Sequence, residues 1–492
     1  MVRVALPHGR HKVFRHLKLP SSRLLATAPG PPGPQLAAGA RDYPWRQWYR
    51  LEKFLKTGQV VVIDGANGTE IQRRGGRPAE TFSSGTAALM RPDLCQEVHQ
   101  AYLESGADVI ITNTYSANGN VMASSGNGGR VDECIMAASA LARRAALNHV
   151  AEHAAQVAQV ASSASAAASS SAAAVTAAAA RATTSLQSNN AAQVSATGSL
   201  KSTRIAAESV NVALHAIEEV HAHAAAAKAA AAAALAASEG LPLPEATPPI
   251  EQPEPVRTKG WDSAGFGPTL IVGSLSTHPP EMAAGGESSC NAKWPAAEIE
   301  ERNYFQAARA IRLSGVDMLF LEMMKDSDHA PRAVRAAAST ALPVFLGLSM
   351  RTCQETGQLV QWSLGVDSIP AHPDWFHSLA QILGPNMVGV NIMHTDFSTM
   401  GPALKFIREE CGWKGPLGCY PDHGRFAAPD WIFQELCIEE AIECVESWIR
   451  DYDVKLIGGC CGLGPEFITA LSAFTRRYNT EVRHRLNGTA SA

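Results

Sequence analysis

Eight short apolar runs, separated by stretches with helical periodicity, limit the folds open to this chain more than any other feature. The runs cover residues 60–64, 108–112, 269–273, 318–322, 343–348, 387–391, 416–420 and 454–458. They are apolar throughout rather than alternating, which is typical of strands buried on both faces. The stretches between them include residues 94–105, 296–314, 328–338, 375–383, 400–411 and 432–452. The alternation predicts an α/β fold with a parallel sheet, and eight units predict closure into a (β/α)8 TIM barrel.

An open, doubly wound sheet would produce the same alternation of strands and helices. The first run, however, is not followed by the glycine-rich phosphate fingerprint that marks a dinucleotide-binding sheet. The closed barrel is therefore the favoured interpretation.

A low-complexity segment interrupts the alternation between the second and third runs. Residues 150–261 are rich in Ala and Ser and then in Pro, with too few large apolar side chains to form a core. We interpret them as an insertion that divides the barrel into residues 46–149 (strands one and two) and 262–480 (strands three to eight). Residues 481–492 are assigned to a C-terminal tail.

The N-terminal residues 1–45 are rich in Arg and Lys and contain no acidic residue before Asp42. This composition is typical of an organelle transit peptide, and equally of a disordered basic tail. A plastid or mitochondrial location is expected in the first case and a cytoplasmic one in the second. The net charge of −4 and the absence of a long apolar run argue against nucleic-acid and membrane partners.

Polar residues gather at the C-terminal ends of the predicted strands, where barrel enzymes place their active sites. The residues at these ends include Asp64 and Gly65, Thr114, Glu322, Asn391, and the adjacent pair Cys460 and Cys461. Carboxylates can hold an ammonium group, amides and hydroxyls a carboxylate, and paired thiolates a soft metal such as zinc. The set therefore predicts a site for a small zwitterion that contains sulfur. Inert core thiols or a vicinal disulfide are the alternative interpretations of the cysteine pair.

Several motifs resemble, in order and spacing, those of the homocysteine S-methyltransferase family. They are Asp64–Gly75, Glu97–Tyr115, Gly389–Asn391, Tyr420–Pro421 and Gly458–Gly462. The resemblance implies a barrel that binds zinc through three cysteines and moves a methyl group to the homocysteine thiol. It also implies that Cys460 and Cys461 are zinc ligands and that Asp64 and Glu322 hold the homocysteine amino group. Gly65, Thr114 and Asn391 are the other residues predicted to bind the substrate.

The resemblance fails at one metal position, because Ile392 stands where the family has its remaining cysteine. One hypothesis is that His394 completes a Cys₂His site, which is a known catalytic zinc set. A second is that Cys419 supplies the missing sulfur. A third is that no catalytic zinc is held, and that the domain has another substrate or none.

These features predict a methyltransferase that forms methionine from homocysteine through a zinc-activated thiolate. S-methylmethionine is the favoured donor, because no cobalamin or folate module is appended. A sulfonium donor needs no general acid, so no catalytic residue is predicted beyond the metal site. The alternatives are a non-catalytic homocysteine- or metal-binding barrel, or a zinc-free transferase with another acceptor. The expected partners are small molecules, and the sequence predicts no oligomeric state.

Overall fold

The computed structural model describes residues 43–76, 85–156, 159, 269–280, 294–362, 369–427, 430–433 and 435–489. The barrel strands are β1 (Val61–Val62), β2 (Val109–Ile111), β3 (Leu270–Ser276), β4 (Met318–Glu322), β5 (Val344–Leu348), β8 (Met387–Asp396), β9 (Leu417–Asp422) and β12 (Leu456–Ile457). They follow the order β1-β12-β9-β8-β5-β4-β3-β2, and a parallel bridge between Ile63 and Val109 joins the two ends of the sheet. Each predicted apolar run overlaps one of these strands, which confirms the (β/α)8 barrel. The predicted N-terminal segment and insertion lie almost wholly outside the described residues.

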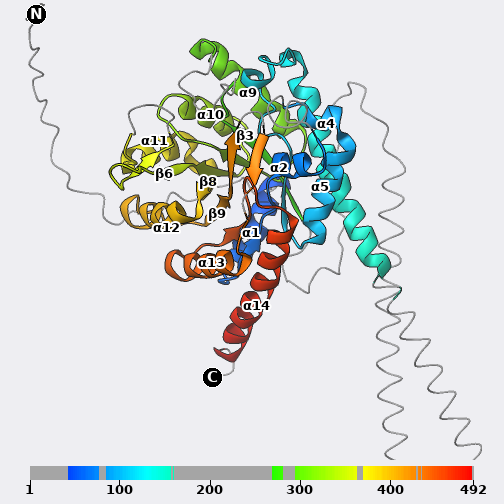
Figure 1. The fold of residues 1–492 in the computed structure, drawn as a ribbon, viewed down its shortest axis with the longest axis vertical. Coiled ribbons are helices and arrows are strands. Elements are labelled where there is room, and N and C mark those ends of the chain that lie inside the picture. Colours follow the sequence, from blue (N-terminus) through cyan, green and yellow to red (C-terminus); the bar gives the residue numbers. More distant parts are fainter. Residues whose placement is uncertain are drawn as a thin grey trace, which may run out of the picture. The chain divides into compact units, whose positions relative to one another are not determined.

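Helices surround the barrel (Figure 1). Those on the first part of the chain are α1 (Tyr43–Leu55), α2 (Asn67–Arg73), α4 (Ala87–Met90), α5 (Pro92–Glu104), α6 (Gly119–Met122) and a helix over residues 131–156. Those on the second part are α9 (Ala297–Leu313), α10 (His329–Ala338), α11 (Pro373–Leu383), α12 (Phe397–Lys405), α13 (Ile438–Tyr452) and α14 (Pro465–Thr489). Residues 481–489, assigned above to a tail, therefore continue the last helix. Among the described residues, no helix is both long enough and apolar enough to cross a membrane.

Two hairpins extend from the C-terminal ends of the strands. One pairs β6 (Met350–Thr352) with β7 (Leu359–Gln361), and the other pairs β10 (Gly424–Ala427) with β11 (Asp430–Phe433). The prediction of a helix over residues 432–452 was wrong at its start, because α13 begins only at Ile438. The residues of β11 are rich in the aromatic and β-branched types that favour a strand.

The core has two layers, which follow the alternation of side chains along each strand. One set of strand residues packs against the surrounding helices. The other set fills the barrel interior together with the apolar face of α1. In this inner layer Trp48 lies edge-on to Phe345, with ring centroids 5.9 Å apart. Trp45 donates a hydrogen bond to the carbonyl of Ala341, just before β5. Helix α1 therefore closes the barrel at the N-terminal ends of its strands, and the opposite end is left for chemistry.

His99 in α5 makes fold stability depend on pH. It is fully buried, and neither ring nitrogen has a hydrogen-bond partner among the described residues. Burial lowers the pKa of His99 to about 4, so the folded state disfavours a proton that the unfolded chain accepts near pH 6.5. Stability is therefore complete above pH 6.5 and falls as the pH drops toward 4, by about 2 kcal/mol between pH 7.5 and pH 5.

Urea unfolding at pH 7.5 and pH 5 tests this prediction with the substitution His99→Leu. Between pH 7.5 and pH 5, the free energy of unfolding should fall by about 2 kcal/mol less in this variant than in the wild type. The exposed His484 provides a control, and H484Q should behave as the wild type does. An unchanged pH dependence in H99L would mean that another group controls the loss.

Candidate metal and substrate site

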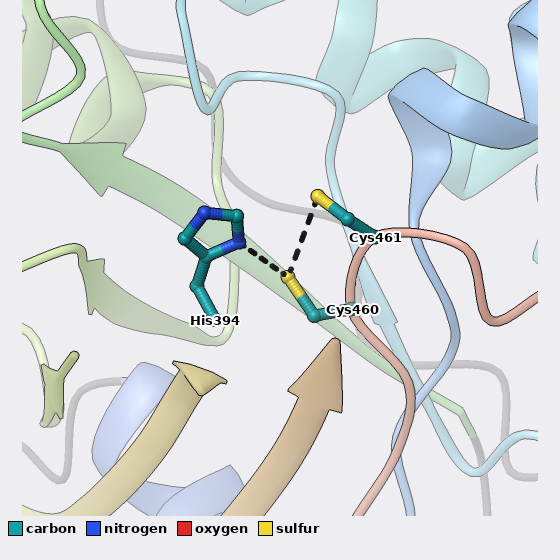
Figure 2. Close-up of side chains that lie close together, drawn as sticks. All are labelled: His394, Cys460 and Cys461. Atoms are coloured by element: carbon teal, nitrogen blue, oxygen red, sulfur yellow. Dashed lines mark hydrogen bonds between the residues drawn. The ribbon is translucent and has the colours of Figure 1, made fainter. Parts of the chain in front are cut away.

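Three side chains that can bind a metal meet at the C-terminal mouth of the barrel. Figure 2 shows the His394 imidazole and the Cys461 thiol on either side of the Cys460 thiol. The Cys460 sulfur lies 3.6 Å from His394 Nδ1 and 3.9 Å from the Cys461 sulfur. One ligand atom from each of the three residues lies within 4.8 Å of the other two. The structure thus brings together two predicted ligands that are adjacent in sequence and a third from a different strand.

The cysteine pair lies in a turn after β12 that the neighbouring strand ends hold in place. The Cys460 amide donates to the carbonyl of Pro421 at 2.7 Å, and the Cys461 carbonyl accepts from the His423 amide at 2.7 Å. Gly462 follows with φ of +84°, and an added Cβ there would collide with the carbonyl oxygen of His423. Only glycine satisfies both conditions, so it fixes where the two thiols point.

His394 reaches the mouth through an irregularity in β8. The pairing of β8 with β9 shifts register between Met393 and Asp396, and His394 adopts a φ of +47°. Bulges of this kind turn a side chain that a regular strand would send elsewhere. The bulge therefore brings the imidazole to the cysteines.

Ile392 lies on the opposite face of the same strand. It is fully buried in the outer core layer, among residues that pack between the strands and the helices. Cys419 belongs to that layer too, and burial raises its pKa. The spatial group of potential ligands contains His394 and neither of these residues. The geometry therefore favours the first of the three hypotheses about the missing ligand.

The chemistry of the three side chains and two of their separations fit a zinc ion. Zinc–sulfur bonds of about 2.3 Å and zinc–nitrogen bonds of about 2.0 Å place tetrahedral ligands about 3.8 Å (sulfur to sulfur) and about 3.5 Å (sulfur to nitrogen) apart. The observed separations of 3.9 and 3.6 Å agree with these values. Two thiolates and one imidazole are also a set that zinc accepts in catalytic sites, where the fourth position stays open.

At the mouth of the barrel, the pKa of a thiol is lowered and that of a neighbouring carboxyl group is raised. The hydrogen bond between Cys460 and Cys461, together with the nearby His394 imidazole, lowers the pKa of Cys460 well below its usual value. Burial, together with the negative charge of Cys460, raises the pKa of Glu322 to about 8. Asp422 Oδ2 lies 3.5 Å from His394 Nδ1. The site therefore stabilises a thiolate next to a carboxyl group that a cationic ligand would ionise.

The predicted substrate residues lie at two depths. Gly65 and Glu322 line the cavity above the metal group. Asp64 is fully buried and accepts from the Ile111 amide through Oδ2, while Oδ1 has no partner among the described residues. Neither amide atom of the buried Asn391 has a partner among those residues. Thr114 instead bonds to the backbone of Ser274 at 2.8 and 3.0 Å, and so joins β2 to β3 rather than lining the cavity.

Sequence reasoning missed several residues of the cavity wall. Trp362 and His278 line the cavity, but Trp362 follows no barrel strand, and His278 lies five residues beyond the predicted run 269–273 because β3 continues to Ser276. Trp362 follows the β6–β7 hairpin, and nothing in its local sequence indicates a site. Asp422 is not part of this wall but lies beside His394, and its place at a predicted strand end, directly after the Tyr420–Pro421 motif, indicated it.

A model of one known protein family matches most of this chain. The model for the family described as homocysteine S-methyltransferase matches residues 61–192 and 182–475. A selenocysteine methyltransferase of Astragalus bisulcatus is 44% identical over 62 residues, which is 13% of this chain and 18% of the relative. Homocysteine S-methyltransferase 1 of Zea mays is 40% identical over 62 residues, 13% of this chain and 19% of the relative. These matches span only about a fifth of the curated relatives' length. A crystal structure of the homocysteine methyltransferase MmuM from Escherichia coli, in its metallated form, aligns with 86% of this chain and 99% of its own, at 16% identity and a TM-score of 0.47.

Proposed function

This chain belongs to the homocysteine S-methyltransferase family, and on that premise we propose that it transfers a methyl group from a sulfonium donor to the thiol of homocysteine. The products are methionine and the demethylated donor, and S-methylmethionine is the proposed donor. The observation that carries the proposal is the cluster of Cys460, Cys461 and His394 beside the buried carboxyl group of Glu322. Such a site suits a substrate with a thiol at one end and an ammonium group at the other.

The proposed metal is zinc, held by those three side chains. Zinc bound there would lower the pKa of the homocysteine thiol, so that a larger share is thiolate at neutral pH. The ligand spacing fits zinc, and two thiolates select a soft metal such as zinc over the hard cations that carboxylates bind.

The residues of the chain position the acceptor for reaction. Glu322 and the Oδ1 of Asp64, which has no hydrogen-bond partner among the described residues, are proposed to bind the ammonium group of homocysteine. The homocysteine sulfur then attacks the methyl carbon, and the electron pair of the broken carbon–sulfur bond leaves with the donor sulfur. Since the donor loses its positive charge in this step, no group has to protonate it. The contribution of the protein is therefore thiolate formation and alignment.

A direct assay tests this function. Purified protein is incubated with S-methylmethionine and with homocysteine whose carbon chain carries carbon-13, and methionine is analysed by mass spectrometry. Labelled methionine and about one zinc per chain by elemental analysis are expected. Binding of homocysteine without any transfer would instead indicate a non-catalytic barrel. Transfer by metal-free protein would indicate a zinc-independent transferase.

The substitution Glu322→Gln tests ammonium recognition separately from metal binding. Losing a buried carboxylate that faces a cation should raise KM for homocysteine about 10- to 100-fold and leave the zinc content unchanged. With 4-mercaptobutyrate, which has the same thiol and no ammonium group, wild type and E322Q should differ little. If E322Q reduced activity equally with homocysteine and with 4-mercaptobutyrate, Glu322 would not bind the ammonium group.

A further inference from the structure

Trp362 is a buried hydrogen-bond donor in the cavity wall. Its side chain is 2% exposed and contributes to the lining of the cavity above the metal group. Its indole Nε1–H has no acceptor among the described residues. An indole can only donate, and a buried donor without a partner is costly enough that such atoms are rare in folded proteins. The atom therefore points to a ligand that brings an acceptor.

Two positive side chains lie over the same indole ring. The Arg351 guanidinium is 4.0 Å from the ring centroid and the Lys325 ammonium is 5.1 Å away. Arg351 pairs with Val360 in the β6–β7 hairpin, so Trp362 is its diagonal neighbour, two residues further along. Lys325 is 1% exposed, and a charge so poorly hydrated acts strongly on its surroundings. The electrostatic potential near the indole therefore favours an anionic acceptor over a neutral one.

The indole also lies next to the metal ligands. Its ring is perpendicular to the His394 imidazole, with centroids 4.8 Å apart and planes at 89°. An acceptor held by Trp362 thus belongs to a molecule that extends to the reacting sulfur. Both substrates of the proposed reaction carry a carboxylate, which is the anion that this position can bind.

We propose that Trp362 Nε1–H donates a hydrogen bond to a substrate carboxylate, with Arg351 and Lys325 supplying the favourable charge. The inference rests on the proposed function for the identity of the two substrates. The carboxylate of the acceptor and that of the methyl donor have the same chemistry, so the experiment below distinguishes them.

The test compares Trp362→Phe with a matched tryptophan. W362F removes the N–H and keeps an aromatic ring against His394. Trp294 also has an Nε1 without a partner among the described residues, but it stacks on His329 with ring centroids 3.8 Å apart and does not line the cavity. W294F is therefore the control. Zinc content and thermal unfolding are measured for both variants to show that the metal group and the fold are intact.

Two substrate pairs identify the carboxylate concerned. Homocysteine is compared with 3-aminopropane-1-thiol, and S-methylmethionine with (3-aminopropyl)dimethylsulfonium, so that each pair differs only by a carboxylate. For one of the two pairs, W362F should lower kcat/KM for the substrate that carries the carboxylate about 10- to 100-fold. For the analogue without the carboxylate, kcat/KM should change less than about threefold. R351M should also lower kcat/KM for that carboxylate-bearing substrate. A loss shared by both members of each pair, or no loss at all, overturns the proposal.

A binding measurement separates this inference from the proposed reaction. Calorimetry with methionine and with 3-(methylthio)propylamine, its decarboxylated form, requires no turnover. Wild type should bind methionine about tenfold more tightly than the amine, and W362F should reduce that ratio. If no methyl transfer occurs but this discrimination is observed, the proposed function fails while the carboxylate site stands. If wild type does not discriminate, the carboxylate site is wrong.

Discussion

Replacing Cys460 with serine is expected to release the zinc and reduce methyl transfer at least about 10³-fold. Cys460 occupies the centre of the ligand group, with His394 Nδ1 at 3.6 Å and the Cys461 sulfur at 3.9 Å. Serine preserves the size of the side chain but removes the thiolate, so two ligands remain for the metal. Because zinc sites generally need three protein ligands, the remaining pair should not retain the ion during purification.

Elemental analysis of C460S should show close to no zinc, against about one per chain in wild type. The matched control is Cys437→Ser, which changes an exposed thiol at the start of α13 and should preserve both zinc and rate. If C460S keeps its zinc and its rate, the metal site proposed here is wrong.

Substitutions at positions 394 and 392 should show which position of β8 can supply the third ligand. His394→Asn is expected to weaken zinc binding about 10- to 10³-fold, measured by competition with a chromophoric chelator. Asparagine tolerates the left-handed backbone of this position better than most residues, so the loss reports on the ligand and not on the fold. H394C should restore affinity, because its thiol would project from the same bulge.

The same experiment places a cysteine at position 392, where the family has one. I392C introduced into H394N should not restore zinc binding, because that side chain faces the helices in the outer core layer. Restored affinity in the double variant would mean that β8 can shift its register and turn position 392 into the mouth.

The positions of the barrel strands were predictable because each strand is buried on both faces. Strands such as Met318–Glu322 are continuous apolar runs, and a run of that kind between polar turns has few other interpretations. Helix α1 and the β6–β7 hairpin were missed for a different reason. Their roles depend on contacts with residues distant in sequence, such as that of Trp48 with Phe345, and no local pattern indicates them.

The candidate site was predictable wherever a functional side chain lies at the end of a predicted apolar run or within three residues after it. Glu322 and the cysteine pair are of this kind, and the structure places them around one cavity. The orientation of His394 depends on a register shift against β9, which sequence periodicity does not show. Thr114 also follows its strand, but its hydroxyl finds backbone partners on β3. Whether a polar group at a strand end meets a ligand depends on such local competition for hydrogen bonds.

The position of the connection between β2 and β3 has a consequence for how this protein can evolve. Gln156, in the helix that follows β2, and Asp108 line a common hollow at the N-terminal ends of the strands. Leu270 begins β3 at the same end of the barrel, away from the metal ligands. Lengthening a connection costs only about 0.6 kcal/mol for each doubling. Mutations that add or remove residues between these two points are therefore close to neutral for chemistry, and selection can change that connection while the catalytic face stays as it is.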